Sequence, residues 1–234
     1  MAERYLIADT HFGHGNINFF AKANGEPLRP WGRALREGED IADVSQEEKD
    51  GRAEEMDEEL VRRWNAVVAP SDKVEVLGDV VIARRHLATV GRLNGKKRLS
   101  GMGNHDIFKV TDYLKYFEDV RSCKPLTFDG KPRLLLSHIP IHEQELSRWG
   151  CNVHGHLHSN RVMTKRDTGV MRSIAVPGAN PPRMSRPFPV TEEVIHPRYL
   201  CVSVEHIDFT PIHLEEVYAR IEKQQNESKG VKLI

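Results

Sequence analysis

The sequence predicts an α/β fold in which two mixed β-sheets form a sandwich flanked by helices. Its first half alternates short apolar runs with amphipathic stretches, a pattern typical of βαβ units that favours a parallel sheet. Its second half is rich in short, strand-like runs. The length of 234 residues, with 39% hydrophobic and 29% charged residues, suits a globular chain with a substantial core. We therefore expect a single domain over residues 1–225, followed by a polar tail at 226–234.

The chain opens with a predicted strand and a long acidic excursion. Residues 4–8 are a short apolar run that ends at a glycine-rich polar loop, which indicates a buried strand. Residues 24–57 are hydrophilic, and between Gly25 and Glu59 there are five basic and thirteen acidic side chains, a net charge of −8. Such a segment cannot form a core of its own. We expect it to be a solvated excursion on the parent domain.

The remaining elements follow from periodicity and from the residues that end each run. Apolar residues at helical spacing predict an amphipathic helix over 53–68, which Pro70 stops. A second helix is expected over 84–93 and a late one over 211–224. Short apolar runs predict further strands at 73–77, 97–100, 124–128, 133–138, 151–154, 171–176 and 199–204.

Composition argues against several classes of protein. Lys and Arg together number 34, as do Asp and Glu, so the surface as a whole does not favour nucleic acid or anionic membranes. No apolar run approaches the roughly 18–20 residues of a membrane span, and the first one breaks at Asp9, too early for a secretory signal core. Three cysteines without CxxC spacing indicate neither a disulfide framework nor a zinc finger. We expect a cytoplasmic enzyme.

Histidine is abundant, with 12 in 234 residues, and it is the commonest metal ligand. Five loops, each after a predicted strand, carry metal-ligand residue types. They are Asp9-x-His11, Gly78-Asp79, Gly103-Asn104-His105-Asp106, Ser137-His138 and Gly155-His156-x-His158. Taken singly, each has an ordinary interpretation, such as a turn or a hydrogen-bonded core histidine. Their shared place beyond the strands lets all five converge on one edge of the sheet.

The converging set suits two metal ions rather than one. It offers more nitrogen and oxygen ligands than the four that a tetrahedral zinc site takes. Two ions roughly 3.5–4 Å apart, sharing a carboxylate, can clamp both oxygens of an in-line phosphoryl displacement. Glycines beside the ligands let backbone and substrate approach closely. The pattern therefore predicts a dinuclear site for phosphoryl chemistry.

These blocks, in this order, resemble those of the calcineurin-like metallophosphoesterases: DxH, GD, GNH[ED], a lone His and GHxH. The resemblance runs from Asp9 through His158 and on to residues 200–204. It is closest to small bacterial and phage-borne members that open with DTHFGH and carry Trp-Asn at the end of the first helix, here Trp64-Asn65. The resemblance implies the calcineurin-like phosphoesterase fold and hydrolysis of phosphoric esters.

The resemblance also implies a role for each residue. One metal would be held by Asp9, His11, Asp79 and His158, and the second by Asp79, Asn104, His138 and His156. His105 would lie outside the metal shell, as the general acid or as a group that binds the phosphoryl oxygen, oriented by a hydrogen bond that Asp106 accepts. His14 and Arg29 are candidates for substrate contact, with loop solvation and an ordinary surface arginine as the alternatives.

The implied cofactors are two divalent metal ions, with Mn²⁺ favoured and Fe, Ni²⁺ or Zn²⁺ also suited to these ligands. They would activate a bridging water that attacks a phosphate mono- or diester. The expected substrate is a small phosphorylated molecule such as a nucleotide. The charge of −8 in the excursion argues against long nucleic acid, although residues 96–98 form a local basic patch.

Two alternatives stay open from the sequence. One is a nuclease or cyclic-nucleotide phosphodiesterase with the same site. The other is a non-catalytic scaffolding module on the same fold, which would be expected to have lost ligands that this chain retains.

Overall fold

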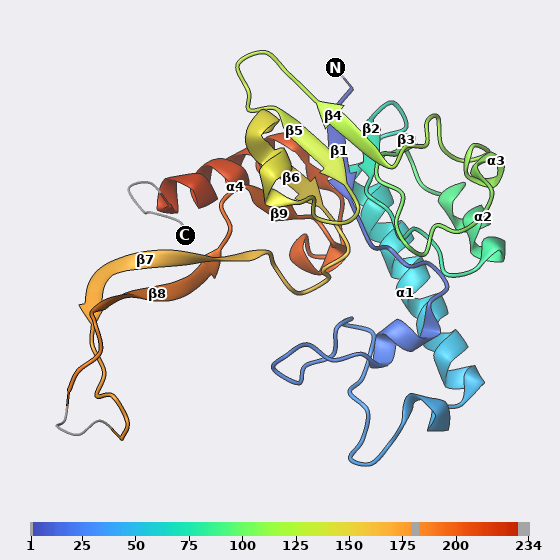
Figure 1. The fold of residues 1–234 in the computed structure, drawn as a ribbon. Coiled ribbons are helices and arrows are strands. Elements are labelled where there is room, and N and C mark those ends of the chain that lie inside the picture. Colours follow the sequence, from blue (N-terminus) through green and yellow to red (C-terminus); the bar gives the residue numbers. More distant parts are fainter. Residues whose placement is uncertain (1, 179–182, 229–234) are drawn as a thin grey trace.

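The computed structural model describes residues 2–178 and 183–228 and has an α/β architecture with two mixed four-stranded sheets (Figure 1). In the first sheet, with strand order β10-β1-β2-β3, three neighbouring strands are parallel and the edge strand β10 is antiparallel. Their bounds are β1 (Arg4–Ile7), β2 (Lys73–Val76), β3 (Lys96–Leu99) and β10 (Ile212–His213). The expected α/β class with mixed sheets is confirmed.

The second sheet has the order β4-β5-β6-β9, and again three of its strands are parallel while β4 is antiparallel. Its strands are β4 (Cys123–Leu126), β5 (Leu134–Ser137), β6 (Cys151–His154) and β9 (Tyr199–Cys201). A separate two-stranded sheet consists of β7 (Met163–Arg172) and β8 (Phe188–Ile195), which extend away from the rest of the chain (Figure 1).

The helices are one long element and several short ones. The α-helices are α1 (Gln46–Val67), α2 (Leu87–Val90), α3 (Val110–Tyr113) and α4 (Leu214–Glu227). Short 3-10 helices span Gly15–Phe19, Ile41–Asp43, Arg84–His86, Glu143–Arg148 and Val204–His206. Within the described ranges, none of the helices is long and apolar enough to cross a membrane.

Helix α1 begins seven residues earlier than the periodicity predicts. Ser45 caps it, because its Oγ accepts a hydrogen bond from the Glu48 amide at 3.1 Å, and acidic residues in the first turn favour a helix N-terminus. Farther along, Met56, Leu60 and Trp64 form the buried face. The second part of the expected acidic excursion is therefore helical, with its charges on the exposed side.

Three other predicted boundaries are wrong. The strand expected at 171–176 ends at Arg172 and is the last part of the ten-residue β7, whose partner β8 the sequence pattern did not indicate. The late helix starts at Leu214, capped by His213, and continues to Glu227, into the predicted tail. The helix expected over 84–93 is a 3-10 turn followed by the four-residue α2.

The two four-stranded sheets adjoin where β1 and β9 end. Ala8 and Ser203 form a parallel bridge, and the Ala8 amide donates to the Val202 carbonyl at 3.0 Å. Apolar residues from both sheets, including Val76 and Val153, belong to one core cluster. This junction brings the loops that follow six parallel strands to a common region, because their carboxyl ends point the same way.

Glu75 on β2 is fully buried and is held by cations from both sheets. Its Oε2 accepts from Lys124 Nζ of β4 at 2.7 Å and from Ser100 Oγ, and its Oε1 pairs with Arg4 of β1. Because the carboxylate lies in the interior, these partners compensate for its lost hydration. The network ties β2 to its own sheet and to the edge of the other.

Replacing Glu75 with Gln is expected to lower the free energy of unfolding by about 3 kcal/mol, because Arg4 and Lys124 then lose the charge that compensates their own partial burial. Urea denaturation followed by circular dichroism measures the change. Glu118→Gln is the matched control, since Glu118 pairs with Arg98 at 3.2 Å on the surface and should contribute under about 1 kcal/mol. Equal losses in the two variants would contradict the assignment.

Candidate metal centre

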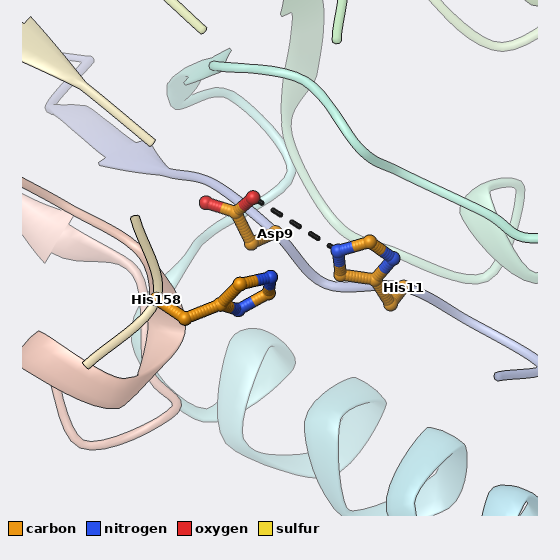
Figure 2. Close-up of side chains that lie close together, drawn as sticks. All are labelled: Asp9, His11 and His158. Carbon is orange, nitrogen blue, oxygen red and sulfur yellow. Dashed lines mark ion pairs between the residues drawn. The ribbon is translucent and has the colours of Figure 1, made fainter. Parts of the chain in front are cut away.

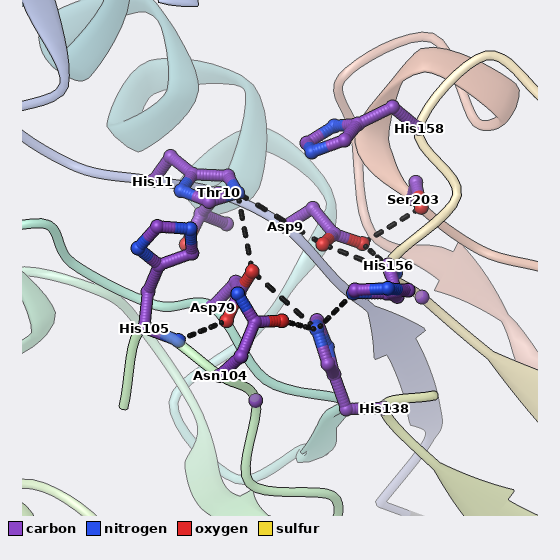
Figure 3. Close-up of polar contacts among 12 residues, drawn as sticks. Asp9, Thr10, His11, Asp79, Asn104, His105, His138, His156, His158 and Ser203 are labelled. Atoms are coloured by element: carbon purple, nitrogen blue, oxygen red, sulfur yellow. Dashed lines mark hydrogen bonds and ion pairs between the residues drawn. The ribbon is translucent and has the colours of Figure 1, made fainter. Parts of the chain in front are cut away.

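The loops after the parallel strands bring two clusters of metal-ligand side chains together. Asp9, His11 and His158 form one cluster, drawn in Figure 2. The other consists of Asp79, His138 and His156 (Figure 3). Within each cluster, one candidate ligand atom from every residue lies within 4.8 Å of the others. The structure therefore gathers six of the seven predicted metal ligands into two triads.

Asp79 lies between the two clusters. Its Oδ2 is 3.5 Å from His11 Nε2 in the first cluster and 3.4 Å from His138 Nε2 in its own. Its Oδ1 accepts a hydrogen bond from the His105 amide at 2.9 Å. One carboxylate oxygen of Asp79 thus faces both triads, and the hydrogen bond to the other oxygen orients the carboxylate.

Asn104, the seventh predicted ligand, joins the second cluster. Its Oδ1 is 3.2 Å from His138 Nε2, and His156 Nδ1 is also 3.2 Å from that nitrogen. Burial disfavours the charged form of His138, but Asp79 and Asp9 outweigh burial and raise its pKa. The other ring nitrogen, Nδ1, lies 2.9 Å from the Leu77 carbonyl, so in the neutral ring Nδ1 keeps the proton. His138 Nε2 then presents a lone pair toward the oxygens of Asp79 and Asn104, an arrangement that a cation suits.

His11 gives the clearest test of whether a metal fits. The residue is buried, and neither ring nitrogen has a hydrogen-bond partner in the described part of the chain. Burial lowers the pKa of His11 well below its ordinary value, and Arg29 lowers it further, so the ring is neutral. A buried neutral imidazole without partners costs free energy unless a ligand uses its lone pair. The residues present fit a metal ion.

The carboxylates at the centre are also perturbed. Burial raises the pKa of Asp9 to about 6, although His158, His138 and Ser203 act in the opposite direction. Burial likewise disfavours the charged form of Asp79, but the neighbouring His138 and the His105 amide outweigh burial and lower the pKa of that carboxyl. The charge at this buried edge is thus balanced by groups that come from both sheets.

Backbone strain is concentrated at the same residues. Seven described non-glycine residues have a positive φ, and five of them are candidate ligands: Asp9, His11, Asp79, His156 and His158. Such conformations cost of order 1–3 kcal/mol each and persist where the surroundings enforce them. A role in stability alone does not explain why the strain falls on five Asp and His residues, whereas a ligand-binding role does.

Two glycines leave room for the carboxylates. A Cβ on Gly103 would lie 2.1 Å from Asp79 Oδ1, and one on Gly155 would lie 2.5 Å from Asp9 Oδ2. These distances are far below van der Waals contact, so no larger residue fits either position while the carboxylates keep their places. The expectation that glycines allow close approach is therefore confirmed for Gly103 and Gly155.

His105 lies beside the two triads and belongs to neither. Its ring is edge-on to His11, with 5.2 Å between ring centroids, and its side chain is partly exposed. His14 lies on the same side, 5.4 Å from the His11 ring and 6.3 Å from the His105 ring by centroids. The expected substrate contact of His14 stays a prediction.

Asp106 does not orient the His105 ring as the resemblance implies. Its carboxylate accepts backbone amides of Asp79 at 2.8 Å, Val80 at 3.1 Å and Gly103 at 2.9 Å. The loop turns the Asp106 side chain inward, so both oxygens are used in holding the β2 and β3 loops together. Asp106 therefore positions the loop that carries Asn104 and His105.

Arg29 also has a different role from the expected one. The side chain is fully buried, and its Nη2 donates to the Asp9 carbonyl at 2.7 Å and lies 3.2 Å from Glu205 Oε1. A guanidinium without solvent access cannot contact a substrate that arrives from solvent. The proposed substrate contact of Arg29 is therefore wrong, and the arginine supports the first cluster from behind.

Glu205 completes that support, and sequence reasoning missed it. Its Oε1 accepts from His158 Nδ1 at 3.0 Å, which leaves His158 Nε2 as the nitrogen with a lone pair. Burial disfavours the charged form of Glu205, but Arg29 and His158 outweigh burial and lower its pKa. Ser203, also missed, donates to Asp9 Oδ2 at 2.7 Å. Both follow β9, so the rule that placed the other site residues beyond strand ends was the available signal.

Comparison with known proteins identifies relatives without a described activity. No family model matches the chain. An uncharacterized protein of Methanocaldococcus jannaschii, MJ1445, is 27% identical over 95% of this chain and 93% of its own length. The gene 66 protein of Mycobacterium phage L5 is 26% identical over 70% of this chain and 82% of its own. The crystal structure of AQ665, a protein of unknown function from Aquifex aeolicus, has a TM-score of 0.53 at 23% identity and covers 93% of this chain and 98% of that one. That likeness extends to the fold alone.

Glu205→Gln is expected to weaken metal binding at the first cluster by about 10–100-fold, because the neutral amide is a weaker acceptor for His158 Nδ1 and no longer balances the charge of Arg29. Calorimetric titration with Mn²⁺ measures both sites, and affinity at the Asp79 cluster should change far less. Glu143→Gln is the matched control, since Glu143 accepts from His196 at 3.1 Å and neither residue belongs to a triad. If Glu205→Gln leaves the Mn²⁺ affinity of the first cluster unchanged, Glu205 does not position His158 for metal binding.

Proposed function

We propose that the chain is a metal-dependent phosphoesterase of the calcineurin-like type, with the corresponding fold and two divalent ions at the candidate centre. The observation that carries the proposal is the position of Asp79, whose Oδ2 lies within 3.5 Å of a histidine nitrogen from each triad. A shared carboxylate is what a dinuclear site requires. The neutral His11, whose ring nitrogens have no hydrogen-bond partner among the described residues, supports the same conclusion.

Each ion would have its own set of ligands. Asp9, His11, Asp79 and His158 would hold one, and Asp79, Asn104, His138 and His156 the other. Mn²⁺ is the favoured ion, with Fe, Ni²⁺ and Zn²⁺ as alternatives that the same nitrogen and oxygen donors accept. When bound, the pair supplies Lewis-acid activation of water and neutralises charge on the phosphoryl oxygens.

The residues of the chain supply the remaining chemistry. His105 lies outside both triads with a partly exposed ring, so an imidazole N–H is free to protonate the leaving oxygen of the ester. The Asp79 carboxylate and Asp106 hold the His105 loop through backbone amides, which orients the acid without using its ring. Most of the candidate ligands are buried, whereas His105 is partly exposed. This arrangement suits a reaction at the solvent-facing side of the site.

The proposed substrate is a small phosphate ester, such as a nucleotide. The chain has equal numbers of basic and acidic residues, and exposed acidic residues of α1 give part of the surface a negative charge. Long polyanions bind through many basic contacts, which this surface does not favour. Monoesters and diesters use the same ligand set, so a substrate panel distinguishes them.

Chelation is expected to abolish hydrolysis, and adding Mn²⁺ or a similar ion is expected to restore it. A panel of chromogenic mono- and diesters, tested with each metal added to chelated protein, measures activity and substrate class together. Metal should also raise the melting temperature, because it relieves the repulsion between the clustered Asp9 and Asp79 carboxylates and binds only the folded chain.

Elemental analysis is the control for complete metal removal. Full activity in demonstrably metal-free protein would contradict the proposal. Metal binding and stabilisation without hydrolysis of any ester would instead favour the scaffolding alternative.

His105→Ala is expected to leave metal content near that of the unaltered protein and to lower kcat by roughly 10²–10⁴-fold, the usual contribution of a general acid. The loss should be small for nitrophenyl esters, whose leaving group needs little protonation, and large for alkyl esters. Steady-state kinetics on both ester types measures the difference.

His213→Ala serves as the matched histidine control, because His213 pairs with Glu3 at 3.0 Å on the surface, outside both triads. Loss of a metal from His105→Ala would make His105 a ligand. A loss of equal size for both ester types would make it a phosphate-binding residue rather than the acid.

A further inference from the structure

The hairpin of β7 and β8 contributes nothing to the core. Residues 163–178 and 183–195, here called the arm, contain the two strands and the described part of their connection, and in the described chain β7 and β8 pair with each other alone. Not one described residue of the arm is buried. In Figure 1 the arm leaves the body near α4 and extends into solvent. The base of the arm lines a pocket with α4, through Met163, Ile195 and Gln224, whereas the rest of the described arm pairs only with itself. An isolated two-stranded hairpin is at best marginally stable in water, so a partner surface would stabilise it.

Apolar side chains are concentrated on the outer part of the arm, which comprises residues 168–178 and 183–191. Val170, Met171 and Met184 are 56–60% exposed, and Ile174 and Phe188 are 49% and 42% exposed. These five are more than a third of the fourteen large apolar side chains that are exposed in the described chain. A patch of this kind on a projecting element is typical of an interaction surface.

The net charge of the outer arm indicates the charge of the partner surface that would bind it. Between Thr168 and Thr191 the sequence has three arginines and no acidic residue. Arg172, Arg183 and Arg186 are all exposed, and none forms an ion pair within the described residues. The partner surface is therefore expected to be acidic and to lie along an extended element.

Helix α1 of the same chain has this character. Glu47, Glu54 and Glu55 on its N-terminal half are exposed and have no ion-pair partner in the part of the chain that the structure describes. Glu47 and Glu54 are two helical turns apart and share a face with the exposed Asp50 and with Glu58, which pairs with Arg92 at 2.6 Å. From Glu47 to Glu58 this stripe is about 16 Å long at 1.5 Å per residue.

The basic stripe on the arm has a similar length. Arg183 is level with Val176, whose amide donates to the Arg183 carbonyl at 2.9 Å, and Arg172 lies four residues back along the chain from Val176. Four residues span at most about 13 Å when extended, which bounds the separation of the two arginines along the arm. In Figure 1 the outer arm and α1 of one molecule are well separated, so the contact is not made within one chain.

We propose that the outer arm docks along the acidic face of α1 in a second copy of this chain, giving a two-fold dimer with reciprocal arm exchange. Each copy presents both the basic, apolar arm and the acidic helix, so one symmetry operation satisfies two identical contacts. The charges fix the position of the arm, and burial of its apolar side chains stabilises the contact. The dimer is independent of the chemistry at the metal centre.

Sedimentation equilibrium and light scattering on the full chain test the proposal. We expect a dimer at about 10–50 μM protein in low salt, weakened at about 0.5 M NaCl because ion pairs are screened. The arm variant Arg172→Glu/Arg183→Glu/Arg186→Glu should raise the dissociation constant at least about 100-fold. The helix variant Glu47→Lys/Glu54→Lys/Glu55→Lys should do the same.

Charge exchange makes the test specific. Mixing the arm variant with the helix variant restores opposite charges at both contacts, so a heterodimer is expected, and one chain carrying all six changes should form a homodimer again. Lys96→Glu/Lys109→Glu/Arg148→Glu is the control for the arm variant, with the same change in net charge at exposed positions elsewhere and no expected effect on the dimer. Circular dichroism confirms that each variant is folded.

Three results would overturn the proposal. A monomeric unaltered protein in low salt excludes the dimer, and a dimer that survives both triple variants uses another surface. Loss of binding to a labelled single-stranded oligonucleotide in the arm variant, with the oligomeric state unchanged, would assign the arginines to nucleic acid instead.

Discussion

The whole arrangement depends on placing two carboxylates at a buried junction between sheets. Asp9 follows β1 of the first sheet, yet both of its oxygens accept the His156 amide and one accepts Ser203 Oγ, and these donors come from the second sheet. A buried charge is tolerated only when such donors satisfy it. The same contacts that make Asp9 tolerable therefore hold the two sheets in register at the Ala8–Ser203 bridge.

The candidate centre was predictable because its residues share one local signal. Asp9, Asp79 and His138 each follow a short apolar strand, and residue type with strand position is enough to propose that they meet. Glu205 carries the same signal after β9, but its significance comes from Arg29 and His158, which are 176 and 47 residues away in the sequence. Such partners are defined by tertiary contact, which no local pattern encodes.

Two other differences between sequence and structure have distinct physical causes. The residues of β8 are exposed on both faces, so they lack the alternation of apolar and polar residues by which a strand is recognised. Asp106 was assigned to His105 because they are neighbours in the sequence. In the folded loop, three backbone amides compete for its carboxylate, and unsatisfied buried amides cost more than a free imidazole at the surface.

The distance along the chain between the supporting residues has a consequence for folding. The centre needs Asp9 from the first strand and Ser203 from beyond the last strand of the other sheet, 194 residues later. Contacts of such high sequence separation form late, because the chain entropy of closing a long loop is lost before they contribute. A partly folded chain, with one sheet formed and the other not, would hold only fragments of each triad. If the centre binds metal as proposed, metal affinity would appear during refolding only when the two sheets have docked.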